Sequence, residues 1–351
     1  MCIEMLAYTK IRSAATRSSS GMTLIELIIV IPILLIVGII IAALFYNYVN
    51  MFIAHNDMVA AAQRADSVLR LLEAPVLHAG LGVNTATSDD YRRAWNENNE
   101  RDHIENSPPP AYWDDAVRIT FDGNGTEAAI RDGGNEAGIV YSVSTRIKLQ
   151  DGAEIADNNA TTLRLISGDL PALDFPNDAS IADRAGNMQS WVSVPGTDTA
   201  VPMLVERDGY KPGDATLAVR VLGKRPGSDA RLWLPMFQDI YRMKAVWAYV
   251  DQTTHTFNLV EFASDGSEPP ATVADRITVE RIRAIRFKLS DDRKYMEVRV
   301  LAMGDTVGAV HSQSLAPSLR ARWSELTDDD ARHHLEEFSV KWRVRNLGEQ
   351  N

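Results

Sequence analysis

The sequence predicts an α+β protein in which one long N-terminal helix precedes an antiparallel β-sheet domain. Near the N-terminus, residues 27–45 form an uncharged apolar run of 19 residues, and helical periodicity continues beyond it. After residue 116, apolar residues recur at every second position with polar residues between them, which is typical of antiparallel strands. No helical segment of comparable strength separates these strands, so a parallel βαβ fold is not expected.

The composition excludes several classes of function. The 351 residues carry a formal net charge of −11, whereas nucleic-acid binding requires a basic surface that displaces counterions. Cys2 is the single cysteine, which excludes an intramolecular disulfide and a thiolate metal site. The fold must therefore be stabilised by burial of a core, which a chain of this length can supply.

The apolar run is long enough to cross a membrane. Its 19 residues span about 29 Å as a helix, close to the hydrocarbon thickness of a bilayer. The segment before it carries Lys10, Arg12 and Arg17 against one acid, Glu4. The positive-inside rule therefore places the N-terminus in the cytoplasm and the bulk of the chain across the membrane, in the periplasm or its equivalent.

A short motif stands directly before the apolar run: Gly21, Met22 and then Thr-Leu-Ile-Glu at 23–26. Together with the basic leader and the unbroken apolar segment, it resembles the class III signal of type IV prepilins. The resemblance implies that a prepilin peptidase cuts between Gly21 and Met22, that Met22 is then N-methylated, and that the apolar helix stays in the mature protein. A glycine at the cut lets the peptidase approach the backbone closely.

Glu26 is the candidate residue for subunit assembly. A carboxylate in a membrane segment is costly and marks a functional site by default. The resemblance implies that Glu26 pairs with the α-amine of Met22 in a neighbouring subunit, which would set the register of a filament. The alternative is that Glu26 lies near the cytoplasmic interface and extends its carboxylate into it.

The helix is expected to have a membrane and filament-core half over 22–46 and an amphipathic half over 47–80, after a leader over 1–21. Pro75 is expected to end or kink it, and Gly80 to cap it. Members of the resembled family often carry a proline about 22 residues into the mature chain, where this sequence has Ala43; Pro32 is present instead. The amphipathic half has a predicted packing stripe of Met51, Met58, Ala62, Ala65, Leu69 and Leu72, and a polar face of Asn56, Asp57, Arg64, Asp66 and Arg70.

A polar segment over 81–115 predicts a long loop, and the β-rich domain is expected over 116–347. Its clearest strands are at 285–289 and 296–300, joined by a turn over 290–294, and at 338–344. The C-terminal stretches 280–289, 295–303 and 336–348 are similar to the tail of PilW-type minor pilins and of the larger minor pseudopilins. Further strands are predicted at 117–121, 139–149, 161–166, 190–194, 201–206, 215–222, 243–250 and 255–262.

The resemblance implies a minor pilin or pseudopilin: a structural and assembly subunit of a type IV pilus or type II secretion-like filament, without enzymatic activity or cofactor. Removal of the leader leaves 330 residues, more than a major pilin generally has. The expected partners are the prepilin peptidase and N-methyltransferase, other pilin or pseudopilin subunits, an inner-membrane assembly platform and membrane lipid, with no nucleic acid. The protein is expected in the inner membrane as a single-pass protein and then in the filament. A pilus, a type II secretion system and a DNA-uptake apparatus all remain open.

Two other functions stay open. In the first, the head is a filament-borne adhesin or binding module, and the loop over 83–115 is the first candidate for its binding surface. In the second, the chain is a membrane-tethered enzyme. The sequence has no histidine spacing for a metal site, no G-x-S-x-G elbow and no phosphate-binding loop, which disfavours the enzyme. Asp122, Gly123 and Asn124 favour a β-turn over a calcium site. His333 and His334 are expected to be a solvated pair before the last strand.

Overall fold

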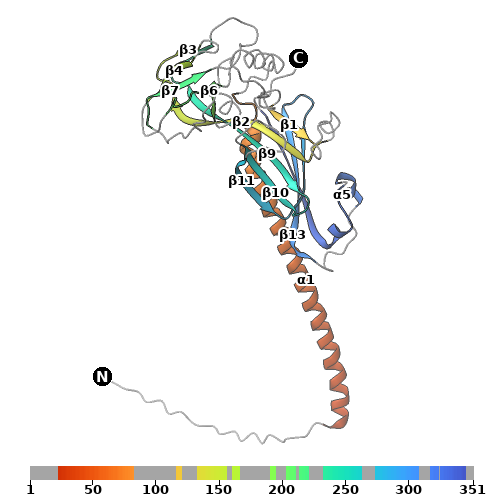
Figure 1. Ribbon diagram of the computed structural model, residues 1–351. Coiled ribbons are helices and arrows are strands. Elements are labelled where there is room, and N and C mark those ends of the chain that lie inside the picture. The colour runs from red at the N-terminus through yellow and green to blue at the C-terminus, as the bar shows by residue number, and fades with distance from the viewer. Residues whose placement is uncertain are drawn as a thin grey trace, which may run out of the picture. The chain divides into compact units, whose positions relative to one another are not determined.

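The computed structural model describes residues 23–82, 116–120, 133–155, 160–166, 190–194, 203–210, 213–220, 232–262, 273–307, 317–323 and 325–344. The chain divides into two compact units, one that ends at Ile53 and one that begins at Ala54. Helix α1 (Leu24–Leu77) contributes its first part to the first unit and its last part to the second (Figure 1). The leader over 1–21 and nearly all of the predicted loop over 81–115 lie outside the described residues.

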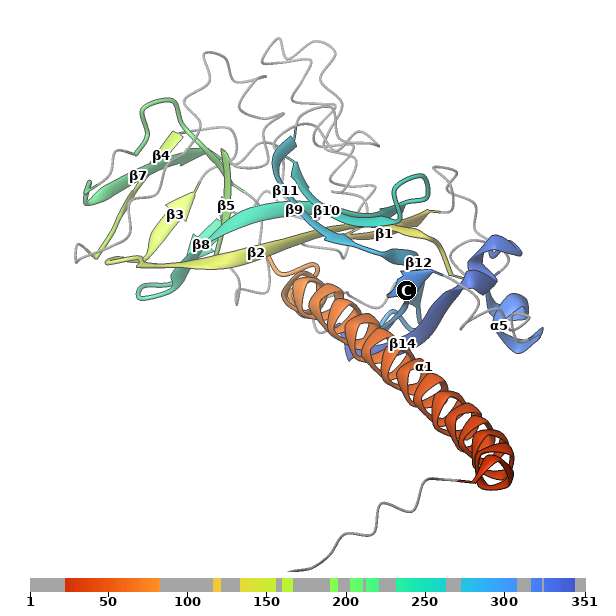
Figure 2. The same cartoon turned by 90° about the horizontal axis from the view of Figure 1, so that it is seen from below.

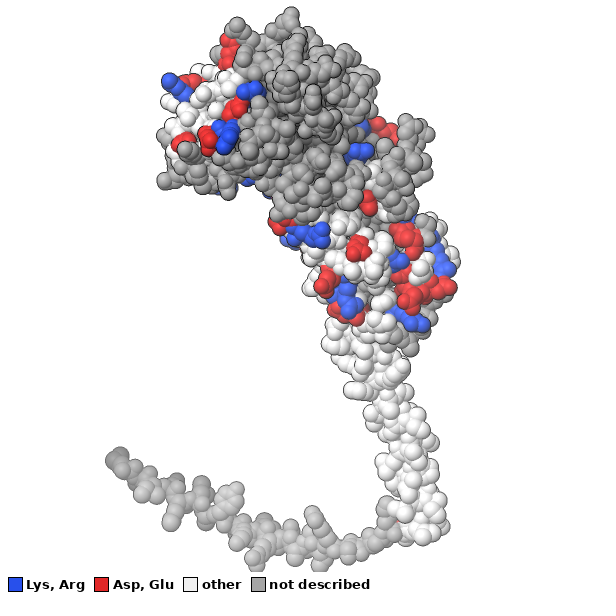
Figure 3. All heavy atoms as spheres, in the orientation of Figure 1, with Lys and Arg blue, Asp and Glu red and all other residues white. Residues whose placement is uncertain are grey.

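In the first unit, α1 is an apolar helix with exposed side chains. Every residue from Thr23 to Tyr48 is exposed, and Glu26 is the one charged residue in this stretch. Figure 3 shows the rest of the stretch in white, without charged side chains. By length and composition, α1 is able to cross a membrane. Pro32 lies inside α1 and does not end it.

In the second unit, α1 is amphipathic and buries one face against the head. The predicted packing stripe is correct at Ala65, Leu69 and Leu72 but wrong at Met51 and Met58, which are 74% and 41% exposed. Ala62 is half-buried. Met51 lies in the first unit, before the part of α1 that packs on the head, and Met58 lies beside the buried stripe of the helix instead of on it. The buried stripe has the spacing of a helix face and consists of Ala61, Ala65, Val68, Leu72 and Val76.

The assignment of Asp57 to the polar face is also wrong. Asp57 is 2% exposed and lies one helical turn before Ala61, in line with the buried stripe. The physical reason is a set of backbone donors on the facing strand, described below, that makes burial of this carboxylate possible.

The end of α1 is close to the prediction. Pro75 is buried inside the last turn and does not end the helix, which stops at Leu77. Gly80 adopts a left-handed φ of 76°, as expected for a glycine that terminates a helix. The Gly80 N–H donates to the Val140 carbonyl at 2.9 Å, so the chain leaves the helix directly against a strand.

The larger sheet of the head is built around two 13-residue strands, β2 (Glu136–Lys148) and β9 (Asp239–Asp251), which lie side by side in Figure 2. β1 (Val117–Thr120) pairs with the far edge of β2. The free edge of β9 is shared by two groups of strands, so the sheet forks. One group is β10 (Thr256–Phe262) and β11 (Val273–Glu280); the other is β5 (Trp191–Ser193), β6 (Met203–Val205), β7 (Thr216–Arg220) and β4 (Ala160–Arg164).

A second sheet contains three strands, β12 (Ile282–Leu289), β13 (Tyr295–Val307) and β14 (His333–Arg343). Between β13 and β14 lie a short helix, α5 (Pro317–Arg322), and a 3-10 turn, η5 (Asp329–Arg332). A small ribbon pairs β3 (Ala153–Ile155) with β8 (Leu232–Leu234). All strand pairs described are antiparallel, so the predicted α+β class is confirmed.

The main core of the head forms where α1 and the two sheets meet. Alternation along β12 and β13 turns Ile285, Phe287 and Val298 into this core, together with the buried stripe of α1. A second core fills the forked end of the larger sheet around Trp191. A third and smaller core, around Trp323, covers the opposite face of the three-stranded sheet.

Candidate functional site

The first described residues of the chain form a helix cap around Glu26. The Thr23 N–H and hydroxyl donate to Glu26 Oε2 at 2.8 and 2.9 Å, and the Glu26 N–H donates to Thr23 Oγ1 at 3.3 Å. This reciprocal pattern is a capping box, in which two side chains satisfy amides that the first helical turn leaves open. Glu26 also places a negative charge at the positive end of the helix dipole.

Glu26 is the one predicted site residue that the structure describes, because Gly21 and Met22 lie outside the described residues. The pattern Thr-x-x-Glu at 23–26 is itself a known signature of a helix start, so the sequence contained the signal for this cap. Glu26 therefore has a local role in starting α1, in addition to the assembly role predicted for it.

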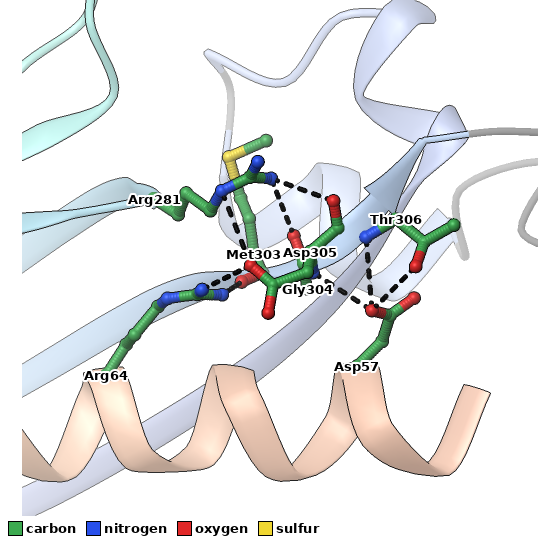
Figure 4. Close-up of polar contacts among 7 residues, drawn as sticks. All are labelled: Asp57, Arg64, Arg281, Met303, Gly304, Asp305 and Thr306. Atoms are coloured by element: carbon green, nitrogen blue, oxygen red, sulfur yellow. Dashed lines mark hydrogen bonds and ion pairs between the residues drawn. The ribbon is translucent and has the colours of Figure 1, made fainter. Parts of the chain in front are cut away.

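A second polar site joins α1 to β13 within the head; we call Asp57, Arg64, Arg281, Asp305 and Thr306 the helix–strand clasp (Figure 4). Asp57 Oδ1 accepts three hydrogen bonds from β13: from the Asp305 N–H at 3.0 Å, the Thr306 N–H at 3.1 Å and the Thr306 hydroxyl at 3.1 Å. Several donors on one carboxylate oxygen offset the loss of water around a buried charge.

A local irregularity of β13 makes these donors available. The pairing of β13 with β14 shifts register between Met303 and Val307, so the amides of this stretch leave the regular ladder. Gly304 lies in the same stretch, and a Cβ built there would approach the Asp57 Cβ to 2.7 Å. A glycine is therefore required for the strand to come this close to the helix.

Two arginines complete the clasp. Arg64, two turns after Asp57 on α1, donates through Nη1 to the Met303 carbonyl at 2.7 Å and pairs through Nη2 with Asp305. Arg281, directly before β12, donates to the carbonyls of Gly304 and Asp305 at 3.2 and 3.1 Å. The bulge of β13 is thus held from both sides, by the helix and by the neighbouring strand (Figure 4).

A buried ion pair fixes the connection between β13 and β14. Arg283 and Asp330 have side chains only 6% exposed, and Arg283 donates to both carboxylate oxygens at 2.6 and 3.1 Å. Burial opposes ionisation of Asp330, but the hydrogen bonds from Arg283 and Thr327 outweigh it and lower the pKa of Asp330. Arg283 also donates to the Glu325 carbonyl at 2.8 Å, which ties the segment before η5 to β12.

Two histidines lie close to this ion pair. Burial and the charge of Arg283 lower the pKa of His255, and burial and the charge of Arg281 lower the pKa of His333. His333 and His334 are the first residues of β14, so their predicted place before the last strand is wrong. Bonding of β14 to Val307 of β13 extends the strand back to His333.

Within the described ranges, no group of three or more His, Cys, Asp or Glu side chains is placed to hold a metal ion. Asp122, Gly123 and Asn124 lie outside those ranges. Comparisons of the chain with known protein families, with proteins of described function and with solved structures found no match.

Proposed function

We propose that this protein is a pilin-like filament subunit, a minor pilin or pseudopilin. In this proposal a prepilin peptidase cuts between Gly21 and Met22 and the new terminus is N-methylated. α1 holds the subunit in the inner membrane, with its start on the cytoplasmic side and the head in the periplasm. The subunit then leaves the membrane through an assembly platform and joins other pilin or pseudopilin subunits in a pilus or a type II secretion-like filament.

The observation that carries the proposal is the exposed apolar part of α1 with a single carboxylate at its start. Side chains such as Ile25, Leu34 and Ile41 are 60–71% exposed. A continuous apolar surface of this kind requires lipid or other apolar helices around it. Membrane insertion supplies the first environment and a bundle of subunit helices the second, and a filament subunit needs both in turn.

The helix–strand clasp supports the same function. A subunit whose helix lies in a filament core needs a head that stays packed on that helix. The clasp meets this requirement, because Asp57 and Arg64 hold a strand whose amides and carbonyls would otherwise be unsatisfied.

The role of Glu26 can be tested with variants that separate its charge from its cap. Glutamine serves in a capping box as glutamate does, so Glu26→Gln keeps the cap and removes the charge. Thr23→Val removes the hydroxyl of the cap and keeps the charge. Glu26→Ala removes both. Each variant is expressed in the native cell in place of the wild-type protein, and its incorporation into filaments sheared from the cells is measured.

Pairing of Glu26 with an amine predicts that Glu26→Gln and Glu26→Ala are both lost from the filament fraction, while Thr23→Val is retained. All three variants should fractionate with membranes, because the apolar helix is unchanged. Normal incorporation of Glu26→Gln together with loss of Thr23→Val would reduce Glu26 to a cap and contradict the assembly role.

A further inference from the structure

The outer face of the three-stranded sheet, opposite to α1, contains a pocket that is rich in cationic side chains. β12 contributes Arg286 and Lys288, and β13 contributes Glu297 and Arg299. The same pocket is lined by Gly133, Arg322 and Trp323. Four cations gather here on a chain whose formal net charge is −11, so the pocket departs from the general charge of the protein.

The register of the sheet brings like charges together in this pocket. Arg286 lies directly across from Arg299, and Lys288 lies directly across from Glu297. Like charges opposite each other on one face of a sheet are destabilising. The Arg286–Arg299 pair therefore needs compensation, which comes in part from the protein's own carboxylates.

Three of the four cations are held by such carboxylates. Arg286 Nη2 bonds Glu325 Oε2 at 2.7 Å, and its guanidinium lies 5.7 Å from the centre of the Trp323 ring. Arg299 Nε donates to Glu297 Oε1 at 2.6 Å. Arg322 Nη2 lies 2.8 Å from Glu337 Oε2. The hydrogen bonds of Arg286 and Arg299 orient their guanidinium groups, and the ion pair with Glu337 holds Arg322 near them, which preorganises the pocket for a ligand.

Lys288 has no such partner among the residues that the structure describes. Glu297, across from it, is engaged by Arg299. Lys341, across from Glu297 on the other side, does not line the pocket, and its Nζ lies over the Tyr295 ring at 4.7 Å. Four cations thus face three carboxylates, which leaves one positive charge in excess, on the exposed Lys288.

Gly133 forms one wall of the pocket and lies close to Lys288. Its neighbour Gly134 exchanges two backbone hydrogen bonds with Phe287, at 2.9 and 2.8 Å. A Cβ on Gly133 would lie 3.1 Å from the Phe287 carbonyl and 3.7 Å from the Lys288 Cβ, and the φ of Gly133 is 96°. Glycine at this position keeps the space beside Lys288 open.

We propose that this pocket binds a singly charged carboxylate, which Lys288 and the guanidinium groups of Arg299 and Arg322 recognise together. Arginine and lysine both make charge-assisted hydrogen bonds to carboxylates. One negative charge matches the excess of one positive charge, whereas a doubly charged phosphate would exceed it. The site stands independently of the proposed filament function, because none of its residues belongs to α1.

The test uses the full-length protein in micelles of a non-ionic detergent at pH 8, where inorganic phosphate is mostly doubly charged, and at low salt, with acetate as the probe. Binding is measured by saturation-transfer NMR on the acetate methyl group. Acetamide, a neutral molecule of the same shape, is the ligand control. Inorganic phosphate is added as a competitor, to compare the two oxyanions. Lys288→Gln removes the excess charge, and Lys148→Gln is the matched control on an exposed lysine of β2.

Saturable binding of acetate and absence of acetamide binding are expected. Lys288→Gln should weaken acetate binding about tenfold, the loss expected for one charge-assisted contact. Lys288→Arg should restore binding, and Lys148→Gln should bind as the wild type does. Unsaturable binding, equal losses in Lys288→Gln and Lys148→Gln, or tighter binding of phosphate than of acetate would each overturn the proposal. Because Lys288 is exposed, a fold unchanged by circular dichroism is expected for all variants.

Discussion

At the scale of single residues, Asp57 explains how a charged group becomes part of the core. It sits at a position of α1 where the buried stripe would place an apolar residue, and β13 supplies three donors to one of its oxygens. An apolar residue there would leave those donors without partners, which costs more than the carboxylate does. Asp57 is thus a structural residue that specifies where β13 docks on the helix.

Replacement of Asp57 by alanine should lower the free energy of unfolding of the head by about 2 to 3 kcal/mol, because buried donors lose their acceptor. The measurement is denaturant unfolding of the detergent-solubilised protein, followed by circular dichroism of the β-sheet signal. Asp66→Ala is the matched control on the same helix: its ion pair with Arg70 is exposed, so the change should stay within about 0.5 kcal/mol. Equal losses in both variants would contradict the role assigned to Asp57.

The role of Glu26 in the helix cap could be predicted from the sequence, whereas the buried position of Asp57 could not. The cap of Glu26 depends on Thr23, three positions away, so both partners are visible in one short motif. The partners of Asp57 are the amides of Asp305 and Thr306, nearly 250 positions away. Whether a helical aspartate faces solvent or a strand bulge depends on the tertiary structure, which helical periodicity does not contain.

At the scale of elements, α1 changes its environment along its length while its backbone stays helical. The apolar run follows from composition, and the start of α1 and its end near Gly80 follow from local capping and termination signals. The hairpin of β12 and β13 was equally predictable, because both strands bury one face and the turn between them is polar. The packing of α1 before Ala61 was not predictable, because helical periodicity does not show where contact with the head begins.

Three strands were missed, and each has a physical reason. β3 and β8 contain three residues each, as do β5 and β6, but β5 and β6 are fully buried apolar-rich runs, whereas β3 begins with the half-buried Ala153 and the exposed Glu154. β11 lies at an edge of the larger sheet, and its residues 275–278 and 280 are exposed, so it lacks a buried face. Strands of this kind are defined by the hydrogen bonds of their neighbours and leave little pattern in the sequence.

The turn between β9 and β10, which contains His255, and the start of β14 at His333 should respond to acid. His255 and His333 have lowered pKa values, from burial and from Arg283 and Arg281 respectively, although Asp330, Asp329 and Asp251 act in the opposite direction. The unfolded chain therefore takes up protons first as the pH falls. The stability from these neutral histidines is complete above pH 6.5, the ordinary histidine value, and is lost as the pH falls through their lowered values.

The melting temperature of the head should accordingly decrease between pH 7.5 and pH 5. The double variant His255→Gln with His333→Gln should have a shallower dependence on pH, because glutamine stays neutral. His55→Gln, an exposed histidine of α1, serves as the control and should keep the wild-type slope. A double variant with an unchanged slope would remove these histidines as the cause.

At the scale of the whole molecule, one continuous helix serves two environments. Its first part exposes apolar side chains and is long and apolar enough to cross a membrane, and its last part belongs to the core of a β-rich head. The clasp and the buried pair of Arg283 with Asp330 hold the parts of that head together through groups that an apolar core alone would not position. The proposed filament subunit uses the first part to assemble and the head to face outward.

Processing of the chain as a prepilin is tested most directly by the intact mass and N-terminal sequence of the membrane-extracted protein. The protein is expressed with and without a prepilin peptidase. We expect an N-methylated terminus at Met22 that depends on the peptidase, with α1 retained. An uncut chain in the presence of the peptidase, or a cut near Ala43 within the apolar helix, would contradict this expectation and leave an anchored or secreted β-rich domain.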